Sequence, residues 1–305
     1  MSRKPDPSVV RVAGPWTHRD VSANGIRLHV AELGEGPLVL LLHGFPEFWW
    51  SWRHQLTALA EAGYRAVAVD LRGYGDSDKP PRGYDGFTLA GDIAGLIKAL
   101  GAQRAHLVGH AWGGATAWTV GAIHPRLVSS VSVLSAPHPL AMRRAFRRHP
   151  RVNSHVLRFQ LPIYPERWLT GENAMQVARL LAAWSGPKWR SAPEFDEVIR
   201  RCRQAMMVPG VAHSAMEYYR WAVRSQIRSD GRRFAEAVDK PMQVPVLQIH
   251  GALDPITLES SARDSRPWLG AGSEFRCLPE AGHFPNQEAP HTTSRLITEF
   301  LQKTS

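Results

Sequence analysis

Short apolar runs alternate with helical segments through the first half of the chain, and this alternation restricts the fold more than any other feature. The runs Leu38–Leu42 and Ala66–Val69 are apolar throughout, as expected of strands buried on both faces, and Ala105–Val108 is a further expected strand. Strands that alternate with helices form a parallel sheet with helices on both faces. The sequence therefore predicts an α/β fold with a mostly parallel, twisted sheet. Further elements are expected over Ile26–Glu32, Trp52–Ala62, Leu89–Leu100, Gly113–Ile123 and Val128–Leu134.

The alternation stops after Ser135 and resumes near residue 241. The segment 136–240 is rich in Arg, Trp and Pro and has helical stretches, such as Ala174–Trp184 and Ala212–Gln226, but no good buried strand. We therefore expect one core domain, formed by 1–135 and 241–305, with a helical insertion over 136–240. The elements expected after the insertion cover Val246–His250, Leu258–Leu269, Glu274–Leu278 and His291–Gln302.

The chain carries a formal net charge of +10, and its arginines are densest in one short segment. A basic patch can bind nucleic acid, but no known nucleic-acid-binding motif occurs in this chain. At helical spacing the run spreads over a solvated face, with apolar stems packed and charged heads in water. Its members are Arg143, Arg144, Arg147, Arg148 and Arg151.

Cysteine content and hydropathy indicate where the protein functions. Only Cys202 and Cys277 occur among 305 residues, which is typical of a reducing compartment and of a protein without a disulfide framework. No segment reaches the roughly 18 consecutive apolar residues of a membrane span. We therefore expect a cytoplasmic protein that binds neither nucleic acid nor a membrane through a spanning helix.

A glycine-flanked turn, Gly109-His110-Ala111-Trp112-Gly113-Gly114, lies between a predicted strand and a predicted helix. It matches the nucleophile elbow, a sharp turn whose central residue is strained and whose neighbours must be very small. The helix that follows directs its positive N-terminus at the turn and favours anionic groups there. Because a plain strand–helix connection could also carry these glycines, the functional interpretation depends on other segments.

Two residues that follow later strands support the functional interpretation of this turn. Asp254 comes after Val246–His250, and His283 comes after Glu274–Leu278. Alone, such an aspartate is more often a turn residue, and such a histidine is more often structural. The order of elbow, acid and histidine is the one that this kind of site requires, so a catalytic pair is favoured. The backbone N–H groups of Phe45 and Trp112 would form a two-donor oxyanion hole.

Taken together, these segments resemble the epoxide-hydrolase branch of the α/β-hydrolases over nearly the whole chain. The resemblance implies the α/β-hydrolase fold, a helical cap over the active site, no metal or cofactor, and a small hydrophobic substrate, an epoxide opened to a vicinal diol. It is carried by HGFPEFWWSWRHQ (43–55), DLRGYGDSDKP (70–80), GHAWGG (109–114), FQLP (159–162) and GHFPNQEAP (282–290). Four motif residues are expected at the substrate pocket: His43, Pro46, Glu47 and His110.

In this branch an aspartate at the elbow attacks an epoxide carbon and forms an ester. Cap phenols donate hydrogen bonds to the opening oxygen, and a histidine held by an acid activates the water that hydrolyses the ester. Tyr219 matches one cap tyrosine, and Tyr218, one register away, competes with it. Counted back from FQLP, the other cap position holds His155, whose imidazole can also donate a hydrogen bond.

The departure from the branch is Ala111, which stands at the nucleophile position and has no nucleophilic atom. The covalent route is therefore disabled in this chain. Two origins remain open: an Asp→Ala substitution engineered to trap a ligand, or a natural protein without the nucleophile. The main alternative function is a small-molecule-binding or neofunctionalised protein, which would have no chemical need for the Asp254–His283 pair.

Related enzyme classes fit the sequence less well. Haloalkane and fluoroacetate dehalogenases need the same carboxylate at position 111. The first class lacks the cap tyrosine assigned to Tyr219, and the second uses arginines at the places where this chain has Trp112 and Ala115. A serine esterase is disfavoured because the elbow holds no serine.

Overall fold

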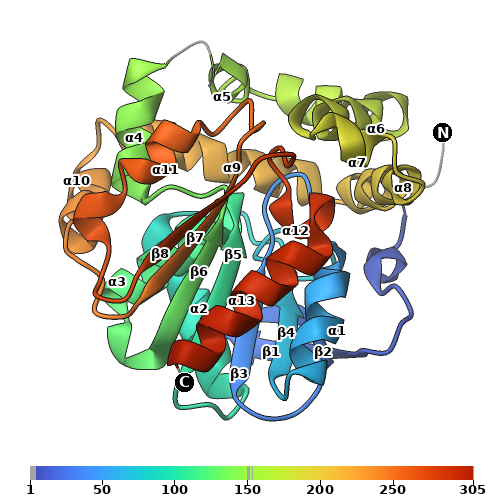
Figure 1. The fold of residues 1–305 in the computed structure, drawn as a ribbon. Helices are drawn as coiled ribbons and strands as arrows, with labels where there is room; N and C mark the ends of the chain where they lie inside the picture. Colours follow the sequence, from blue (N-terminus) through green and yellow to red (C-terminus); the bar gives the residue numbers. More distant parts are fainter. Residues whose placement is uncertain (1–4, 150–151, 153, 305) are drawn as a thin grey trace.

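The computed structural model describes residues 5–149, 152 and 154–304, which form an eight-stranded sheet with flanking helices (Figure 1). The strand order is β1-β2-β4-β3-β5-β6-β7-β8. β2 runs antiparallel to β1 and β4, and the other neighbours pair in parallel, so the predicted α/β-hydrolase fold is confirmed. The strands are β1 (Thr17–Ala23), β2 (Ile26–Leu33), β3 (Leu38–Leu42), β4 (Arg65–Val69), β5 (Ala105–His110), β6 (Val128–Leu134), β7 (Val246–Gly251) and β8 (Glu274–Leu278).

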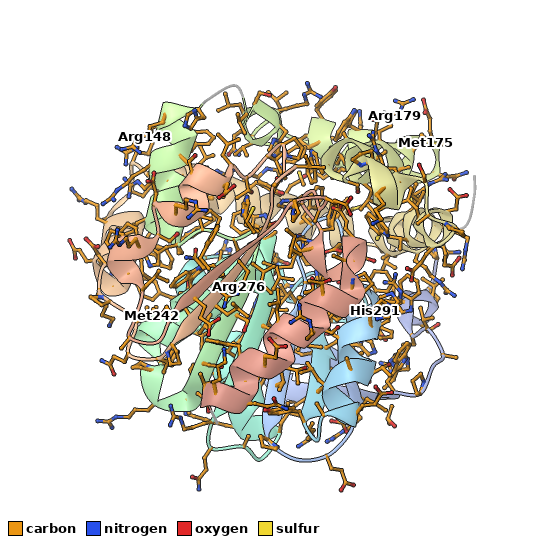
Figure 2. All side chains as sticks on the ribbon, viewed as in Figure 1. Arg148, Met175, Arg179, Met242, Arg276 and His291 are labelled. Carbon is orange, nitrogen blue, oxygen red and sulfur yellow. The ribbon has the colours of Figure 1, made fainter. Side chains whose placement is uncertain are left out.

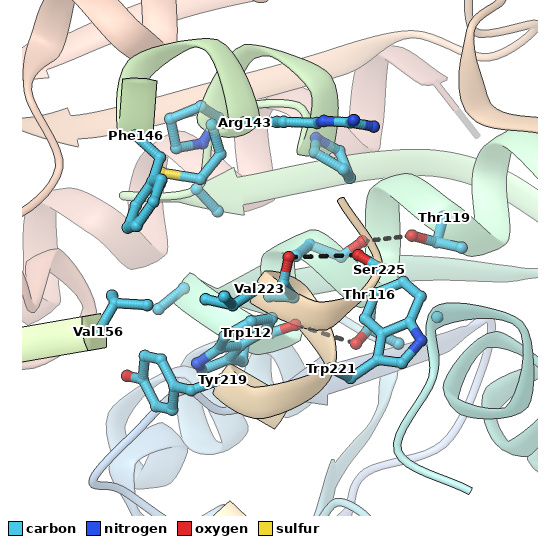
Figure 3. Close-up of a pocket in the computed structure, with 18 of the residues that line it drawn as sticks. Trp112, Thr116, Thr119, Arg143, Phe146, Val156, Tyr219, Trp221, Val223 and Ser225 are labelled. Atoms are coloured by element: carbon cyan, nitrogen blue, oxygen red, sulfur yellow. Dashed lines mark hydrogen bonds between the residues drawn. The ribbon is translucent and has the colours of Figure 1, made fainter. Parts of the chain in front are cut away.

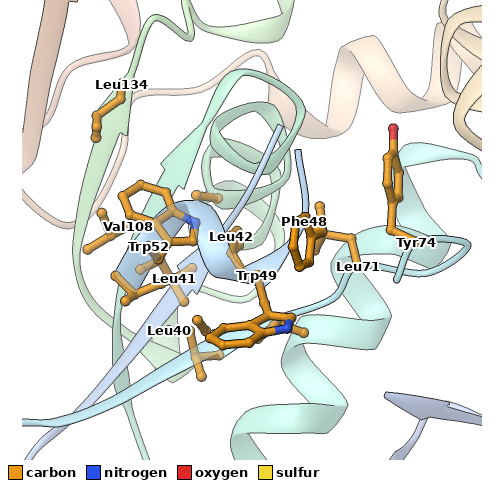
Figure 4. Packing of buried hydrophobic residues seen from close by; sticks show 14 of the residues in the cluster. Leu40, Leu41, Leu42, Phe48, Trp49, Trp52, Leu71, Tyr74, Val108 and Leu134 are labelled. Carbon is orange, nitrogen blue, oxygen red and sulfur yellow. The ribbon is translucent and has the colours of Figure 1, made fainter. Parts of the chain in front are cut away.

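The central strands are buried because helices cover both faces of the sheet. α1 (Arg53–Glu61) and α13 (Pro290–Thr304) pack together on one face, and α2 (Gly86–Ala99) and α3 (Ala111–Ile123) pack together on the other. Every residue of β3 is buried, as its continuous apolar run predicts. Figure 4 shows the β3 leucines among the side chains of the core, which also include Trp49 and Trp52.

Helices α4 to α10 fill the chain between β6 and β7. α4 and α10 contact α3, whereas α5 to α9 lie over the carboxyl ends of the strands (Figure 1). The boundary of the cap at 136–240 stays a prediction. The helices are α4 (Pro139–Arg148), α5 (Ser154–Arg158), α6 (Tyr164–Trp184, with non-helical backbone at Gly171–Ala174), α7 (Pro187–Arg190), α8 (Glu194–Met207), α9 (Val211–Arg224) and α10 (Ser229–Val238).

Some elements differ from the sequence expectation. β1 was not expected, and its exposed edge residues explain why its pattern is weak. The helix expected over Leu258–Leu269 is only α11 (Glu259–Arg263) followed by a 3₁₀ turn, because Pro267 interrupts it. The remaining short elements are α12 (Pro285–Glu288) and the 3₁₀ turns η1 (Pro7–Val10), η2 (Trp49–Trp52), η3 (Pro125–Leu127) and η4 (Arg266–Trp268).

The arginine-rich run lies on α4 and points mostly to solvent. Arg144, Arg147 and Arg148 are exposed, and Figure 2 shows Arg148 at the outer surface. Arg143 is partly buried, and Arg151 lies outside the described residues. Within the described ranges, none of the helices combines the length and apolar character needed to cross a bilayer. Both cysteine thiols are free.

The close approach of β3 to α3 yields a testable prediction. A Cβ added at Gly113 would collide with the backbone carbonyl groups of Leu42 and His43. Because backbone cannot move aside cheaply, Gly113→Ala should lower the free energy of unfolding by about 3 kcal/mol, as measured by urea denaturation. Gly171→Ala is the matched control, since no atom lies within 4 Å of its Cβ position, and it should be nearly neutral. Equal effects of the two changes would contradict this account.

Candidate active site

The elbow lies where β5 passes into α3. Ala111, the first residue of α3, has a φ of +46°, a conformation that a residue with a side chain adopts only at a cost. Gly109 and Gly113 permit it, because a Cβ at either position would collide with neighbouring backbone. The Ala111 side chain is thereby fixed at the cavity wall, with the first turn of α3 behind it.

His283 and Asp254 form the pair expected from the sequence. Nδ1 of His283 lies 2.7 Å from Oδ2 of Asp254, and both side chains are buried. The other carboxylate oxygen accepts backbone N–H groups from Ile256 at 3.0 Å and Thr257 at 2.8 Å. Burial alone would raise the pKa of Asp254, but His283 and these donors outweigh it and hold that pKa below its ordinary value. The carboxylate therefore stays ionised and orients the imidazole, with Nε2 directed away from the pair.

Tyr219 and His155 line the same cavity as Ala111 and His283. Their ring centroids are 6.2 Å apart, and the Tyr219 ring packs edge-on against Trp112 at 5.0 Å. Burial raises the pKa of the Tyr219 phenol, which keeps it protonated. Burial, with a smaller contribution from His283, lowers the pKa of His155 to about 4, which keeps its imidazole neutral. The Tyr219 phenol therefore has a proton to donate at neutral pH, whereas the neutral imidazole has a single N–H, and its ring also bonds the backbone of Val152.

The competing candidate Tyr218 has a different partner. Its phenol is fully buried and donates to the backbone carbonyl of Arg72 at 2.8 Å. Tyr218 is not part of the cavity wall, whereas Tyr219 is, so Tyr219 is the better match to the expected cap tyrosine. In the close-up of the cavity, Tyr219 and Trp112 lie side by side (Figure 3).

The cavity has a volume of about 210 Å³ and a mainly apolar wall. Phe45 and Trp112, the expected oxyanion-hole residues, both contribute to it. Its hydroxyl groups are largely occupied by their own helices: Thr116 donates to the carbonyl of Trp112, and Thr119 donates to that of Ala115 (Figure 3). Arg143 is the permanently charged side chain among the described wall residues; its Nη2 donates to the Gln226 carbonyl at 3.2 Å, and its buried Nε has no partner in the described part of the chain.

The expected pocket positions of His43, Pro46, Glu47 and His110 need correction. All four are buried, but none belongs to the cavity wall among the described residues. His43 donates from Nδ1 to the Gly44 carbonyl and accepts the Leu71 N–H at Nε2. The chain turns between Gly44 and Glu47, so neighbours in this motif face different directions. Adjacency in sequence therefore does not show which side chains reach the cavity.

His110 and Glu47 instead form a buried pair that supports the loop carrying His283. Nδ1 of His110 lies 2.7 Å from Glu47, and Nε2 lies 2.8 Å from the backbone carbonyl of His283. Gln287 donates to the other oxygen of Glu47. Despite burial, Glu47 raises the pKa of His110, and His110 with His43 and Gln287 lowers the pKa of Glu47. The elbow is therefore tied to the loop that carries His283.

Glu288 is a residue that the sequence reasoning missed. Its carboxylate accepts the backbone N–H groups of Gly186, Gly282 and Phe284 at 2.8, 2.8 and 3.0 Å. The backbone N–H of His283 donates to the carbonyl of Trp184 in α6. The loop that carries His283 is thus bound to the inserted helices. The motif GHFPNQEAP contained Glu288, but only the fold shows that three separate N–H groups converge on it.

The pH dependence of stability tests the supporting role of Glu47. A lowered carboxyl pKa contributes stability that is present above the ordinary value and lost as pH falls, and a raised histidine pKa contributes stability that is lost as pH rises. The pair therefore contributes most between about pH 4.5 and 6.5. We expect Glu47→Gln to lower the free energy of unfolding by about 3 kcal/mol in that window and by less at pH 8. The exposed control Glu35→Gln should have little effect, and a Glu47→Gln loss that does not vary with pH would contradict the assignment.

Comparisons with known proteins place the chain in a family. The sequence pattern of the α/β hydrolase fold family matches residues 37–290. Epoxide hydrolase 3 of Siraitia grosvenorii is 43% identical over 94% of this chain and 98% of its own length, and epoxide hydrolase A of Mycobacterium tuberculosis is 35% identical over 94% and 98%. The crystal structure of an epoxide hydrolase from Vigna radiata superposes with a TM-score of 0.81, at 31% identity over 95% of this chain and 98% of that one. The chain belongs to the α/β-hydrolase family, in its epoxide-hydrolase branch.

Proposed function

We propose that the cavity is an epoxide-opening site, with position 111 as the place of the nucleophile. The observation that carries the proposal is the convergence of four groups on one cavity: position 111 at the elbow, the Asp254-bound His283, and the hydrogen-bond donors Tyr219 and His155. A mainly apolar wall suits a small hydrophobic epoxide. This chain carries Ala111, so the covalent route is disabled in it.

With a carboxylate at position 111, the first step would be attack on an epoxide carbon. A C–O bond forms to the carboxylate and the strained C–O bond of the ring breaks. Negative charge develops on the former ring oxygen, where Tyr219 and His155 donate hydrogen bonds. Because the raised pKa of Tyr219 keeps its phenol protonated, Tyr219 has a proton to donate at neutral pH; neutral His155 can donate from one ring nitrogen only, so its contribution requires that this N–H turn from the Val152 backbone to the ligand.

The second step would be hydrolysis of that ester. Nε2 of His283 accepts a proton from water, and the resulting hydroxide attacks the ester carbonyl; the acyl C–O bond then breaks, and the departing alkoxide takes the proton from the imidazolium to complete the diol. The buried carboxylate of Asp254, whose Oδ2 lies 2.7 Å from Nδ1 of His283, stabilises the imidazolium that forms. The backbone N–H groups of Phe45 and Trp112 would stabilise the oxyanion. This chain retains every side chain assigned to the second step.

The second candidate function is small-molecule binding without turnover, or another reaction in the same cavity. It is favoured by Ala111 itself, which leaves an intact cavity with no nucleophile at the elbow. A natural alanine at position 111 supports this candidate. An engineered alanine supports an epoxide hydrolase that the substitution has inactivated. The genomic codon at position 111 separates the two origins.

We predict that Ala111→Asp turns on epoxide opening. Loss of one member of a catalytic unit costs about 10⁴- to 10⁶-fold in rate, so the gain should be of that order. The measurement is diol formation from a panel of small aromatic and aliphatic epoxides. Ala115→Asp is the matched control, because it adds a carboxylate to the same wall away from the elbow. Equal turnover by the unmodified chain and by the Ala111→Asp form would show that position 111 is not the nucleophile site.

A further inference from the structure

We propose that residues 157–167, which join α5 to the first turn of α6, dock the protein onto the surface of an anionic lipid membrane. This stretch is called the docking segment below. Binding of this kind needs no spanning helix, because apolar side chains enter the headgroup region of the bilayer while basic side chains meet the lipid phosphates. It is also independent of the chemistry at position 111.

Exposed apolar side chains are concentrated in the docking segment. Four of the seven large apolar side chains that the described residues expose lie in it. A single exposed apolar side chain is ordinary, but a contiguous group marks a surface that another body covers. The four are Leu157, Leu161, Ile163 and Tyr164, which are 53, 50, 61 and 48% exposed.

The backbone of the docking segment is anchored to α9 from beneath. Arg220, itself buried, donates to the backbone carbonyl of Leu161 at 2.9 Å. The side-chain amide of Gln160 donates to the backbone carbonyl of Tyr219 at 3.3 Å. Ile163 has a φ of +65°, which is rare for a β-branched residue, and still presents its side chain to solvent. The apolar side chains are therefore held at the surface by a fixed backbone.

The charge of the docking segment complements an anionic surface. Arg158 and Arg167 are exposed, and neither forms an ion pair with any of the described residues. The single acid of the segment, Glu166, is already bound by Arg220 and His213. The net charge of +10 on the whole chain adds a long-range attraction in the same direction.

These features favour a bilayer over other occupants. At a bilayer interface, phosphates and acyl chains lie side by side, as do the arginines and the apolar side chains of the docking segment. Nucleic acid would satisfy the arginines but leave the four apolar side chains in water. A second copy of the segment would cover the apolar side chains but bring like charges together.

The docking segment adjoins the cavity. His155 and Val156, which directly precede it, line the cavity (Figure 3). Phe159 within it is buried, with its ring centroid 5.0 Å from that of Tyr219. Figure 1 shows α5 and α6 at the end of the molecule opposite the C-terminus. A docked protein would therefore hold its apolar cavity next to the lipid, where apolar ligands are concentrated.

The first test is sedimentation of the full-length chain with vesicles of phosphatidylcholine alone and of equal parts phosphatidylcholine and phosphatidylglycerol. We expect clear binding to the mixed vesicles and binding weaker by about tenfold or more to the neutral ones. Leu161→Ser combined with Ile163→Ser should weaken binding to the mixed vesicles about tenfold or more, because less apolar surface is buried. Ile227→Ser is the matched control, since Ile227 is 92% exposed outside the docking segment, and it should bind as the unmodified chain does.

The second test removes charge. Arg158→Gln combined with Arg167→Gln should weaken binding to the mixed vesicles about tenfold or more, with a smaller effect in high salt, where the charges are screened. Arg19→Gln combined with Arg295→Gln is the matched control. It removes the same net charge from exposed positions on β1 and α13 and should have a much smaller effect.

Three results would overturn the inference. The first is no binding of the unmodified chain to the mixed vesicles. The second is equal binding by the docking-segment variants and their matched controls. The third is a dimer, seen by light scattering, that Leu161→Ser with Ile163→Ser converts to a monomer without any change in vesicle binding, because a second copy would then cover the segment. None of these measurements uses turnover, so failure here leaves the proposed function standing.

Discussion

Between β5 and α3 the chain turns within one residue, Ala111, whose φ of +46° is held by backbone packing on both sides. Glycines at 109 and 113 allow β3, β5 and α3 to approach so closely that no Cβ fits between them. This packing fixes three things together: the position of residue 111, the direction of the α3 N-terminus, and the place of the Trp112 backbone. His283, Tyr219 and His155, which come from other segments, line the same cavity as this residue.

The loop that carries His283 is held from two directions. On the core side, His110 bonds both Glu47 and the His283 carbonyl, and on the side of the inserted helices, the His283 N–H bonds the Trp184 carbonyl. Glu288 joins the two sides by accepting three backbone N–H groups. Buried, charge-assisted hydrogen bonds of this kind are among the stronger ones in proteins. The loop that carries His283 is therefore held on both sides by buried hydrogen bonds.

Sequence reasoning reached those features whose signal is local. The apolar runs gave the central strands, the glycine pattern gave the elbow, and the order along the chain gave Asp254 and His283. It failed where the outcome depends on side-chain direction or on contacts between distant segments. Glu47 and His110 lie in motifs beside the cavity but are absent from its described wall, and they bond each other instead. Tyr218 and Tyr219 are neighbours in sequence, and only the packing of α9 shows that the first phenol bonds Arg72 while the second faces the cavity.

The central claim is that residue 111 is the covalent acceptor position of an epoxide-opening site. It is tested most directly by intact-protein mass spectrometry after exposure to an epoxide, with Ala111→Asp combined with His283→Gln. This account predicts that the mass of the double variant rises by one epoxide molecule, with the adduct on residue 111, and that His283→Gln alone gains no mass. No change in the mass of the double variant, or an adduct at another residue, would contradict the claim.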